Sequence, residues 1–262
     1  MSSASGNSRA DNSARRPVLF IQRRPAEGPG ALAEVLGECG LAWRCSRLHA
    51  GDVLPSGLDD WSLLVILGDA LVSTGAPGGG VAPSLVELVS LAVRRDFPTI
   101  GVGSGAGLLL GRAGGNSDGA GAPLAGWLPV ELTAAGRADQ ALANLPPTFP
   151  GFHWHRHDLA VTEGAVSLAE TQGVGCQAFR VGQKVYGFGF HPEITGWMVG
   201  RWIDAYPDVL GARAEGVATI HRETAENADG SRQRMRELLR GLLPALGVVP
   251  PGMGPVVKRA VE

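Results

Sequence analysis

The chain has 262 residues, of which 44% are hydrophobic and 18% charged, and its formal net charge is −2. This length suits one large α/β domain with tails, and the balanced charge argues against a nucleic-acid or anionic-membrane partner. Three cysteines, Cys39, Cys45 and Cys176, are too few for a disulfide framework in a chain this long and favour a reducing, cytoplasmic location. No residue pattern predicts a cofactor.

The two ends of the chain differ in composition from the rest. Residues 1–16 are small and polar and are expected to form a disordered tail. The apolar run that follows is too short for a signal-peptide core or a membrane span. Residues 247–262, with several prolines and glycines, are expected to form a second, loose tail. Residues 17–246 contain no convincing linker and are predicted to form one domain.

The first half of the chain alternates short apolar runs with longer helical patterns. Apolar runs without polar alternation are typical of parallel strands that are buried on both faces. Strands are predicted at 17–22, 42–49, 61–68 and 97–102, and helices at 30–40, 84–96 and 107–114. Repeated strand–turn–helix units predict a doubly wound, mostly parallel sheet with helices on both faces. Functional groups in such sheets lie at the carboxyl ends of the strands.

The second half of the chain contains short alternating runs separated by glycine turns. This pattern predicts a small antiparallel β extension. The strands are expected at 125–133, 152–161, 175–182 and 184–190, and helices at 195–210 and 213–246.

The stretch GVGSGAG, residues 101–107, follows a predicted strand and precedes a predicted helix. Gly101 and Gly105 frame position 103 as the middle of a small–x–nucleophile–x–small turn, whose backbone N–H groups can hold an oxyanion. Position 103 is itself glycine and has no side chain to attack with. Ser104 is a candidate nucleophile only if the turn shifts by one residue. The other interpretation is a glycine-rich turn that only packs a helix against a sheet.

The stretch GFGFHPEIT, residues 187–195, places His191 and Glu193 on either side of a proline. The proline fixes the local backbone and prevents a helix there. A carboxylate beside an imidazole orients the ring and stabilises its protonated form, as the base and its orienting partner do in a catalytic triad. The alternative is a surface histidine with a glutamate nearby.

Three histidines alternate in FHWHRHD, at His153, His155 and His157. In a strand they would point to one face, and imidazoles are zinc ligands. Three such positions span too far to converge on one ion without a bend in the strand. A partly buried strand of aromatic residues and histidines is therefore favoured, and no metal site is predicted.

Taken together, these segments resemble the stand-alone branch of the class I glutamine amidotransferase family. The resemblance covers most of residues 17–243. It is carried by the His-Pro-Glu segment at 175–195, the Trp-His strand and the run after it at 152–171, the glycine-rich turn within 97–115, and the strand at 61–69. It implies a flavodoxin-like fold, a nucleophile elbow at the turn, and catalytic roles for His191 and Glu193.

The departures from the family pattern gather at its pocket. The cysteine at the family's elbow is Gly103 here, and the leucine after it is Ser104. The second glycine of the family's Gly-Gly-Pro, whose N–H serves the oxyanion hole, is Asp69. The glutamine usual before Phe-His-Pro-Glu is Gly189. The positions expected to line the substrate pocket are Gly68, Asp69, Gly103, Gly105, Ala106, Gly107, His155 and Gly189.

These departures leave three hypotheses for function. Without the thiol no thioester with glutamine can form, so glutaminase activity is not expected unless another group attacks. The first hypothesis is a repurposed enzyme in which His191, oriented by Glu193, acts as general acid and base on a different, larger small molecule, with Asp69 or Ser104 as helpers. The second is a non-catalytic ligand-binding or scaffold protein. The third is a hydrolase that uses Ser104, His191 and Glu193. A partner enzyme is left open.

Overall fold

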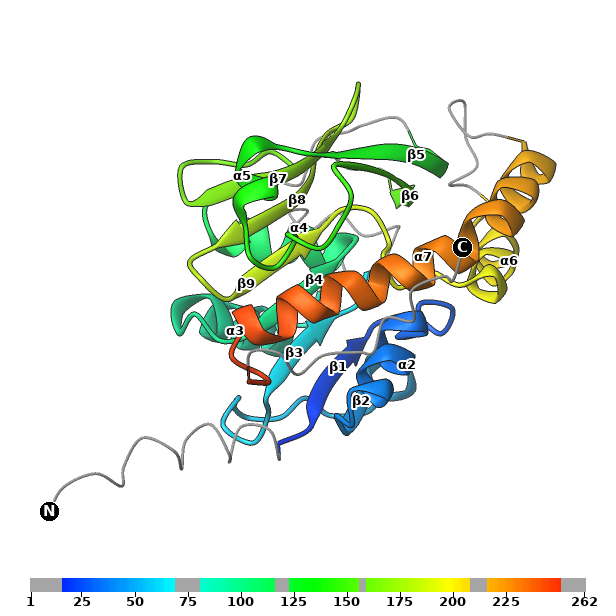
Figure 1. Ribbon diagram of the computed structural model, residues 1–262. Coiled ribbons are helices and arrows are strands. Elements are labelled where there is room, and N and C mark those ends of the chain that lie inside the picture. Colours follow the sequence, from blue (N-terminus) through cyan, green and yellow to red (C-terminus); the bar gives the residue numbers. More distant parts are fainter. Residues whose placement is uncertain (1–15, 69–80, 116–122, 156–158, 208–215, 251–262) are drawn as a thin grey trace, which may run out of the picture.

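The computed structural model describes residues 16–68, 81–115, 123–155, 159–207 and 216–250 (Figure 1). One sheet holds nine strands of this part of the chain, in the order β2-β1-β3-β4-β9-β8-β7-β5-β6. The strands are β1 (Val18–Gln22), β2 (Trp43–Arg47), β3 (Leu63–Ile66), β4 (Thr99–Val102), β5 (Leu124–Leu132), β6 (Thr148–His155), β7 (Ala165–Thr171), β8 (Gly175–Val181) and β9 (Val185–Phe188). The helices are α2 (Gly30–Glu38), η1 (Leu48–Ala50, a 3₁₀ turn), α3 (Pro83–Arg94), α4 (Ser104–Arg112), α5 (Ala134–Ala138), α6 (Gly196–Ala205) and α7 (Val217–Ala245).

The parallel half of the sheet consists of β2, β1, β3, β4 and β9, each parallel to its neighbours within this set. Every residue of β1, β3, β4 and β9 is buried, which explains why their sequences are unbroken apolar runs. Strand β9 was predicted to be antiparallel. It is antiparallel to β8 but parallel to β4, so it completes the parallel half and brings the segment after it beside the end of β4.

The antiparallel half of the sheet consists of β8, β7, β5 and β6. The sequence pattern does not reveal β7 or the short α5, because β7 carries small and polar residues and its pairing with β8 is interrupted by register shifts at Ser167, Ala169 and Glu170. The strand predicted over 42–49 is shorter than expected and ends at Arg47, where the 3₁₀ turn begins.

Helices cover both faces of the parallel half. Side chains of β1 alternate between two cores: Val18 and Phe20 pack with residues of α2 and α7, whereas Leu19 and Ile21 pack with residues of α3 and α4. Figure 1 shows α7 crossing the first of these faces beside α2. This is the doubly wound arrangement that the sequence predicts.

The C-terminal helix is held to the first helix by charge as well as by apolar packing. Arg232 of α7 forms an ion pair with Glu34 of α2 at 2.7 Å, and Arg236 forms one with Glu38 at 2.8 Å. Beyond α7, Val248 and Val249 are buried in the same core, so the packed chain extends a few residues past the predicted boundary at 246. None of the helices in the described ranges is both long and apolar enough to cross a lipid bilayer.

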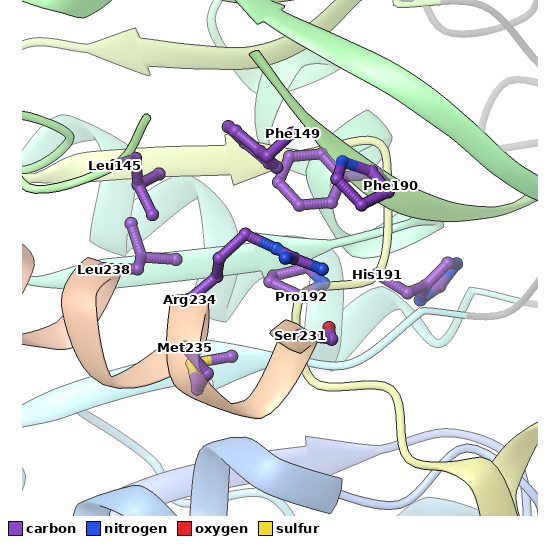
Figure 2. A pocket seen from close by; sticks show the side chains of 11 residues that line it. Leu145, Phe149, Phe190, His191, Pro192, Ser231, Arg234, Met235 and Leu238 are labelled. Carbon is purple, nitrogen blue, oxygen red and sulfur yellow. The ribbon is translucent and has the colours of Figure 1, made fainter. Parts of the chain in front are cut away.

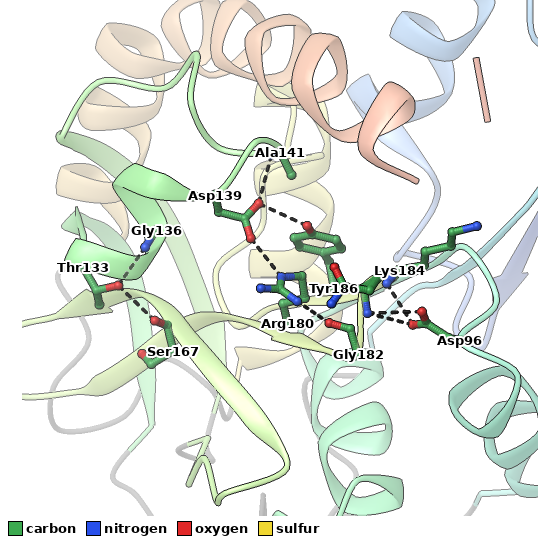
Figure 3. A network of polar contacts seen from close by, with 11 residues as sticks. Asp96, Thr133, Gly136, Asp139, Ala141, Ser167, Arg180, Gly182, Lys184 and Tyr186 are labelled. Atoms are coloured by element: carbon green, nitrogen blue, oxygen red, sulfur yellow. Dashed lines mark hydrogen bonds and ion pairs between the residues drawn. The ribbon is translucent and has the colours of Figure 1, made fainter. Parts of the chain in front are cut away.

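A buried carboxylate ties the antiparallel half to the parallel half (Figure 3). Asp139 accepts hydrogen bonds from Arg180 Nε at 2.9 Å, Tyr186 Oη at 3.1 Å and the backbone N–H of Ala141 at 2.9 Å. Burial, together with the Asp139 carboxylate, raises the pKa of Tyr186 far above its usual value. The tyrosine is therefore a neutral donor, and the network joins the end of α5 to β8 and β9.

Candidate active site

The glycine-rich turn is a sharp corner between β4 and α4. Gly103 lies between the last residue of the strand and the first residue of the helix, with φ 56° and ψ −124°. This left-handed conformation is strained for residues with a side chain and free of strain for glycine. The backbone N–H of Gly103 donates to Phe188 O of β9 at 2.8 Å. The strand–turn–helix context that a nucleophile elbow requires is therefore present.

The glycines around the corner are required by close contacts. A Cβ at Gly105 would overlap the carbonyl oxygen of Ile66, and a Cβ at Gly101 would lie 2.6 Å from Leu109 Cδ1. A Cβ at Gly68 would lie 2.9 Å from the carbonyl oxygen of Val102. These glycines let α4 sit directly against the ends of β3 and β4. Their presence has a packing reason that is independent of any ligand.

His191 and Glu193 form a hydrogen-bonded pair, which is buried rather than on the surface. His191 Nδ1 lies 2.8 Å from Glu193 Oε1, and the two residues are 3% and 2% exposed. The imidazole stands edge-on to Trp202 of α6 with ring centroids 4.6 Å apart. The backbone N–H of His191 donates to Phe152 O of β6 at 2.8 Å. The ring is thus held by the carboxylate, by an aromatic neighbour and through the backbone.

The other nitrogen of His191 faces the corner. A Cβ built at Gly103 would lie 3.2 Å from His191 Nε2 and 2.8 Å from Cε1. Nε2 is buried and has no hydrogen-bond partner among the described residues. The imidazole therefore stands where a side chain at position 103 would begin, and a side chain there would force the ring to move.

Ser104, the alternative candidate for a nucleophile, is hydrogen-bonded to Arg23 and not to His191. It is the first residue of α4, and its hydroxyl accepts a hydrogen bond from Arg23 Nη1 at 3.1 Å. Because Nε2 of His191 has no partner among the residues that the structure describes, the serine is not hydrogen-bonded to the imidazole that would have to activate it.

The remaining predicted pocket residues lie in different places. Ala106 and Gly107 are buried inside α4, and Ala106 packs in the core between α3 and the sheet. Gly189 lies on the segment before His191, and a Cβ there would lie 2.8 Å from Oε1 of Gln177. Asp69 lies outside the described residues.

Two histidines of β6 lie near the pair. His153 is fully buried, its Nδ1 is 3.4 Å from His155 Nε2, and burial, together with His155 and His191, lowers its pKa well below the usual value. His153 is therefore neutral at physiological pH. His157, the third histidine of the run, lies outside the described residues. No group of three or more His, Cys, Asp or Glu side chains in the described ranges is arranged to hold a metal ion.

Several site residues are absent from the sequence prediction. Arg23 follows β1 directly and touches the corner through Ser104, a position at the carboxyl end of a parallel strand that could have drawn attention. Gln177 is 1% exposed, and its Oε1 has no partner within the described part of the chain. Trp202 could not have been assigned, because its contact with His191 depends on how α6 packs.

A small cavity lies on the α7 side of the His191 segment (Figure 2). Its volume is about 10 Å³, which is room for about one water molecule. Figure 2 shows Ser231 and Arg234 of α7 facing Phe190 and Pro192 across it. The Nη2 atom of Arg234 is buried and lacks a partner among the described residues. This cavity is too small for an organic ligand.

The three thiols are free and lie away from the corner, on or next to α2, on β2 and on β8. Burial raises the pKa of Cys39 and of Cys176 to about 11, and it also raises the pKa of Cys45. Because the thiolate is the attacking form, none of them is activated as a nucleophile at neutral pH.

Comparison with known proteins finds similarity both in sequence and in fold. No family model matches the chain. The protein YfeJ of Salmonella typhimurium, whose name describes it as glutamine amidotransferase-like, is 29% identical over 225 residues, which are 85% of this chain and 93% of YfeJ.

Solved structures show the same fold. A glutamine amidotransferase from Thermotoga maritima superposes with a TM-score of 0.75 at 21% identity, covering 88% of this chain and 98% of its own. A glutamine amidotransferase from Methylobacillus flagellatus superposes with a TM-score of 0.77 at 23% identity, covering 94% and 99%. In sequence the chain is similar to a glutamine amidotransferase-like protein, and its fold is that of solved class I glutamine amidotransferases.

Proposed function

We propose that this protein does not release ammonia from glutamine through a thioester, and that His191 and Glu193 act as a general acid–base pair on a different small molecule. The observation that carries the proposal is the buried pair itself, with a Nδ1–Oε1 distance of 2.8 Å and with Nε2 turned toward a corner that has no side chain.

The geometry of the pair sets the role of each nitrogen. The Glu193 carboxylate accepts a hydrogen bond, so Nδ1 carries the proton that it donates. In the neutral ring Nε2 then has the free lone pair and can take a proton from a ligand atom. Once protonated, the ring is stabilised by Glu193 and can return the proton. Elimination, isomerisation, cyclisation, and hydrolysis by a water molecule can each use a group that takes up a proton and returns it, while the other bonds break and form within the substrate or between the substrate and water.

The lack of a hydrogen-bond partner for His191 Nε2 among the described residues is evidence that a ligand binds beside this nitrogen. A buried polar atom without a hydrogen bond costs about 1–3 kcal/mol, so such atoms in native proteins call for a reason. A hydroxyl, amine or water of a bound molecule would supply the partner. Oε1 of Gln177, on β8 and next to Gly189, is a second buried atom of this kind.

The absence of covalent chemistry follows from position 103 and from the thiols. Gly103 cannot attack glutamine, and the raised pKa values of Cys39, Cys45 and Cys176 keep these thiols protonated. We therefore propose a small-molecule substrate other than glutamine. The free cysteines also support the cytoplasm as the proposed location.

The test compares the wild-type protein with His191→Gln in a mixture of small cellular metabolites analysed by mass spectrometry. We expect at least one compound to be consumed by the wild type and spared by the variant. Glu193→Gln should reduce the same conversion, because it removes the orienting charge. A conversion that is equally fast in all three proteins would sink the proposal, and circular dichroism checks that each is folded.

A non-catalytic ligand-binding role is the second candidate, and one observation favours it. Nε2 is closed to solvent and the imidazole fills the space beside Gly103. This candidate predicts that a compound retained by the protein is recovered unchanged from both the wild type and His191→Gln.

The serine hydrolase is disfavoured by the Arg23–Ser104 hydrogen bond. It predicts labelling of Ser104 by a fluorophosphonate probe, and we expect none.

A further inference from the structure

A cavity of about 410 Å³ lies at the carboxyl ends of β1 and β2, and neither His191 nor Glu193 lines it. Arg23 and Arg24 follow β1, His49 follows β2, and Ala82 and Leu85 belong to the start of α3. The volume is in the range of sites for small organic ligands.

The topology of the sheet makes the carboxyl end of β1 an expected place for a ligand. Strand β1 lies between β2 and β3, so the chain leaves β1 toward one side, to β2, and later returns to the other side, to β3. In doubly wound sheets, ligands bind outside the carboxyl ends of the strands at such a switch point. The cavity lies at these ends, whereas the His191 site lies at the end of β4.

The charges around the cavity favour an anion. Arg23 is 8% exposed and Arg24 is exposed, and a guanidinium matches the geometry of phosphate and carboxylate oxygens. His49 adds an imidazole. Among the acidic residues of the described ranges, Asp52 forms an ion pair with Arg47, and Glu27 is buried and is not one of the residues that line the cavity.

The start of α3 adds a second, independent source of positive potential. This helix has 12 residues, begins with Pro83 and has no acidic residue in its first turn, and its N-cap residue, Ala82, provides no side-chain cap. Pro83 has no N–H, and the N–H groups of Leu85 and Val86 donate to Ala82 O, so the N–H of Ser84 and the helix dipole are what favour an anion nearby. Ala82 and Leu85 place this end of the helix on the wall of the cavity.

We propose that this cavity binds a phosphate-bearing small molecule, whose phosphate is held by Arg23, Arg24 and the N-terminus of α3. The site goes beyond the proposed acid–base function, because the His191 pair takes no part in it. It is nonetheless coupled to the corner, since Arg23 also donates to Ser104 at the start of α4.

Isothermal titration calorimetry of the full-length protein tests the proposal with matched probes at constant ionic strength. Ribose 5-phosphate and inorganic phosphate should bind with a dissociation constant at or below about 1 mM, and ribose should not bind. Arg24→Gln, at an exposed position, should weaken phosphate binding about tenfold, as expected for the loss of a charge-assisted hydrogen bond. The matched control is Arg44→Gln, on the exposed part of β2 and outside the cavity lining, which should bind as the wild type does.

Three results would overturn the proposal. One is no binding of either phosphate compound, and another is equal weakening in Arg24→Gln and Arg44→Gln, which would indicate non-specific attraction. The third is succinate binding as tightly as ribose 5-phosphate, which would point to a general anion site. His191→Ala should retain phosphate binding. That result separates this site from the acid–base proposal, which fails independently if no conversion depends on His191.

Discussion

At the scale of single residues, the site depends on what stands next to His191. Glu193 holds one ring nitrogen, Trp202 packs against the ring, and Gly103 leaves room for the ring at the corner. The sequence could predict the pair and the missing side chain, since both are read directly from short motifs. It could not predict that the imidazole occupies the space beside Gly103, because that depends on how β9, β6 and α6 meet.

His153 should make the stability of the protein depend on pH. Burial, with His155 and His191 nearby, lowers its pKa in the folded state, whereas in the unfolded chain it returns to the usual value near 6.5. Below that value the unfolded state binds the additional proton. The free energy of unfolding should therefore fall as pH decreases, by up to about 1.4 kcal/mol per pH unit from this group.

Urea unfolding at several pH values between about 7.5 and about 5.5 measures this slope. His153→Gln should flatten it, whatever its effect on stability at neutral pH. His221→Gln, at an exposed position of α7, should leave the slope as it is in the wild type. An unchanged slope in His153→Gln would show that this histidine is not the group responsible.

At the scale of elements, the corner between β4 and α4 is fixed by close packing of backbone. The sequence predicted this strand, this helix and the turn between them, because closely spaced glycines after an apolar run are typical of a tight strand-to-helix turn. It missed β7 and α5, whose residues are small or polar and show no clear period. It also assigned β9 to the antiparallel set, since pairing with β4 is a long-range choice that no local pattern specifies.

Two glycines of α4 provide a matched test of that packing. A Cβ at Gly105 would overlap the carbonyl oxygen of Ile66, whereas a Cβ at Gly111 would meet nothing within 4 Å. Gly105→Ala should lower the free energy of unfolding by about 1–3 kcal/mol. Gly111→Ala should raise it by about 0.5–1 kcal/mol, because alanine is the better helix former. Chemical denaturation measures both, and equal effects would contradict the described contact.

The hydrogen bonds of Asp139 should stabilise the packing of the antiparallel half of the sheet against the parallel half. Asp139→Ala removes the acceptor of three hydrogen bonds, and it leaves Arg180 and the buried Tyr186 without that partner. We expect a loss of about 1–3 kcal/mol in the free energy of unfolding. Arg95→Ala breaks the exposed pair with Asp59 and should change it by less than about 1 kcal/mol. Thermal or urea unfolding distinguishes the two, and a similar small loss in both would refute a structural role for Asp139.

At the scale of the whole molecule, one sheet positions the two proposed sites. The carboxyl end of β4 and the segment after β9 bring Gly103 and His191 together, although they are far apart in sequence. The carboxyl ends of β1 and β2, at the other side of β3, carry Arg23, Arg24 and His49. The doubly wound fold was predictable from the alternation of strands and helices. The second region was not, because it needs the strand order and the cavity.

The loss of the nucleophile at position 103 is tested by glutamine hydrolysis with the purified protein, followed as glutamate release. A glutamine amidotransferase that has its cysteine serves as the positive control. We predict no glutamate above that of a heat-denatured sample, because position 103 has no nucleophile and the pKa values of the three thiols are raised. Glutamate release that increases with protein concentration and disappears in His191→Ala would contradict the account.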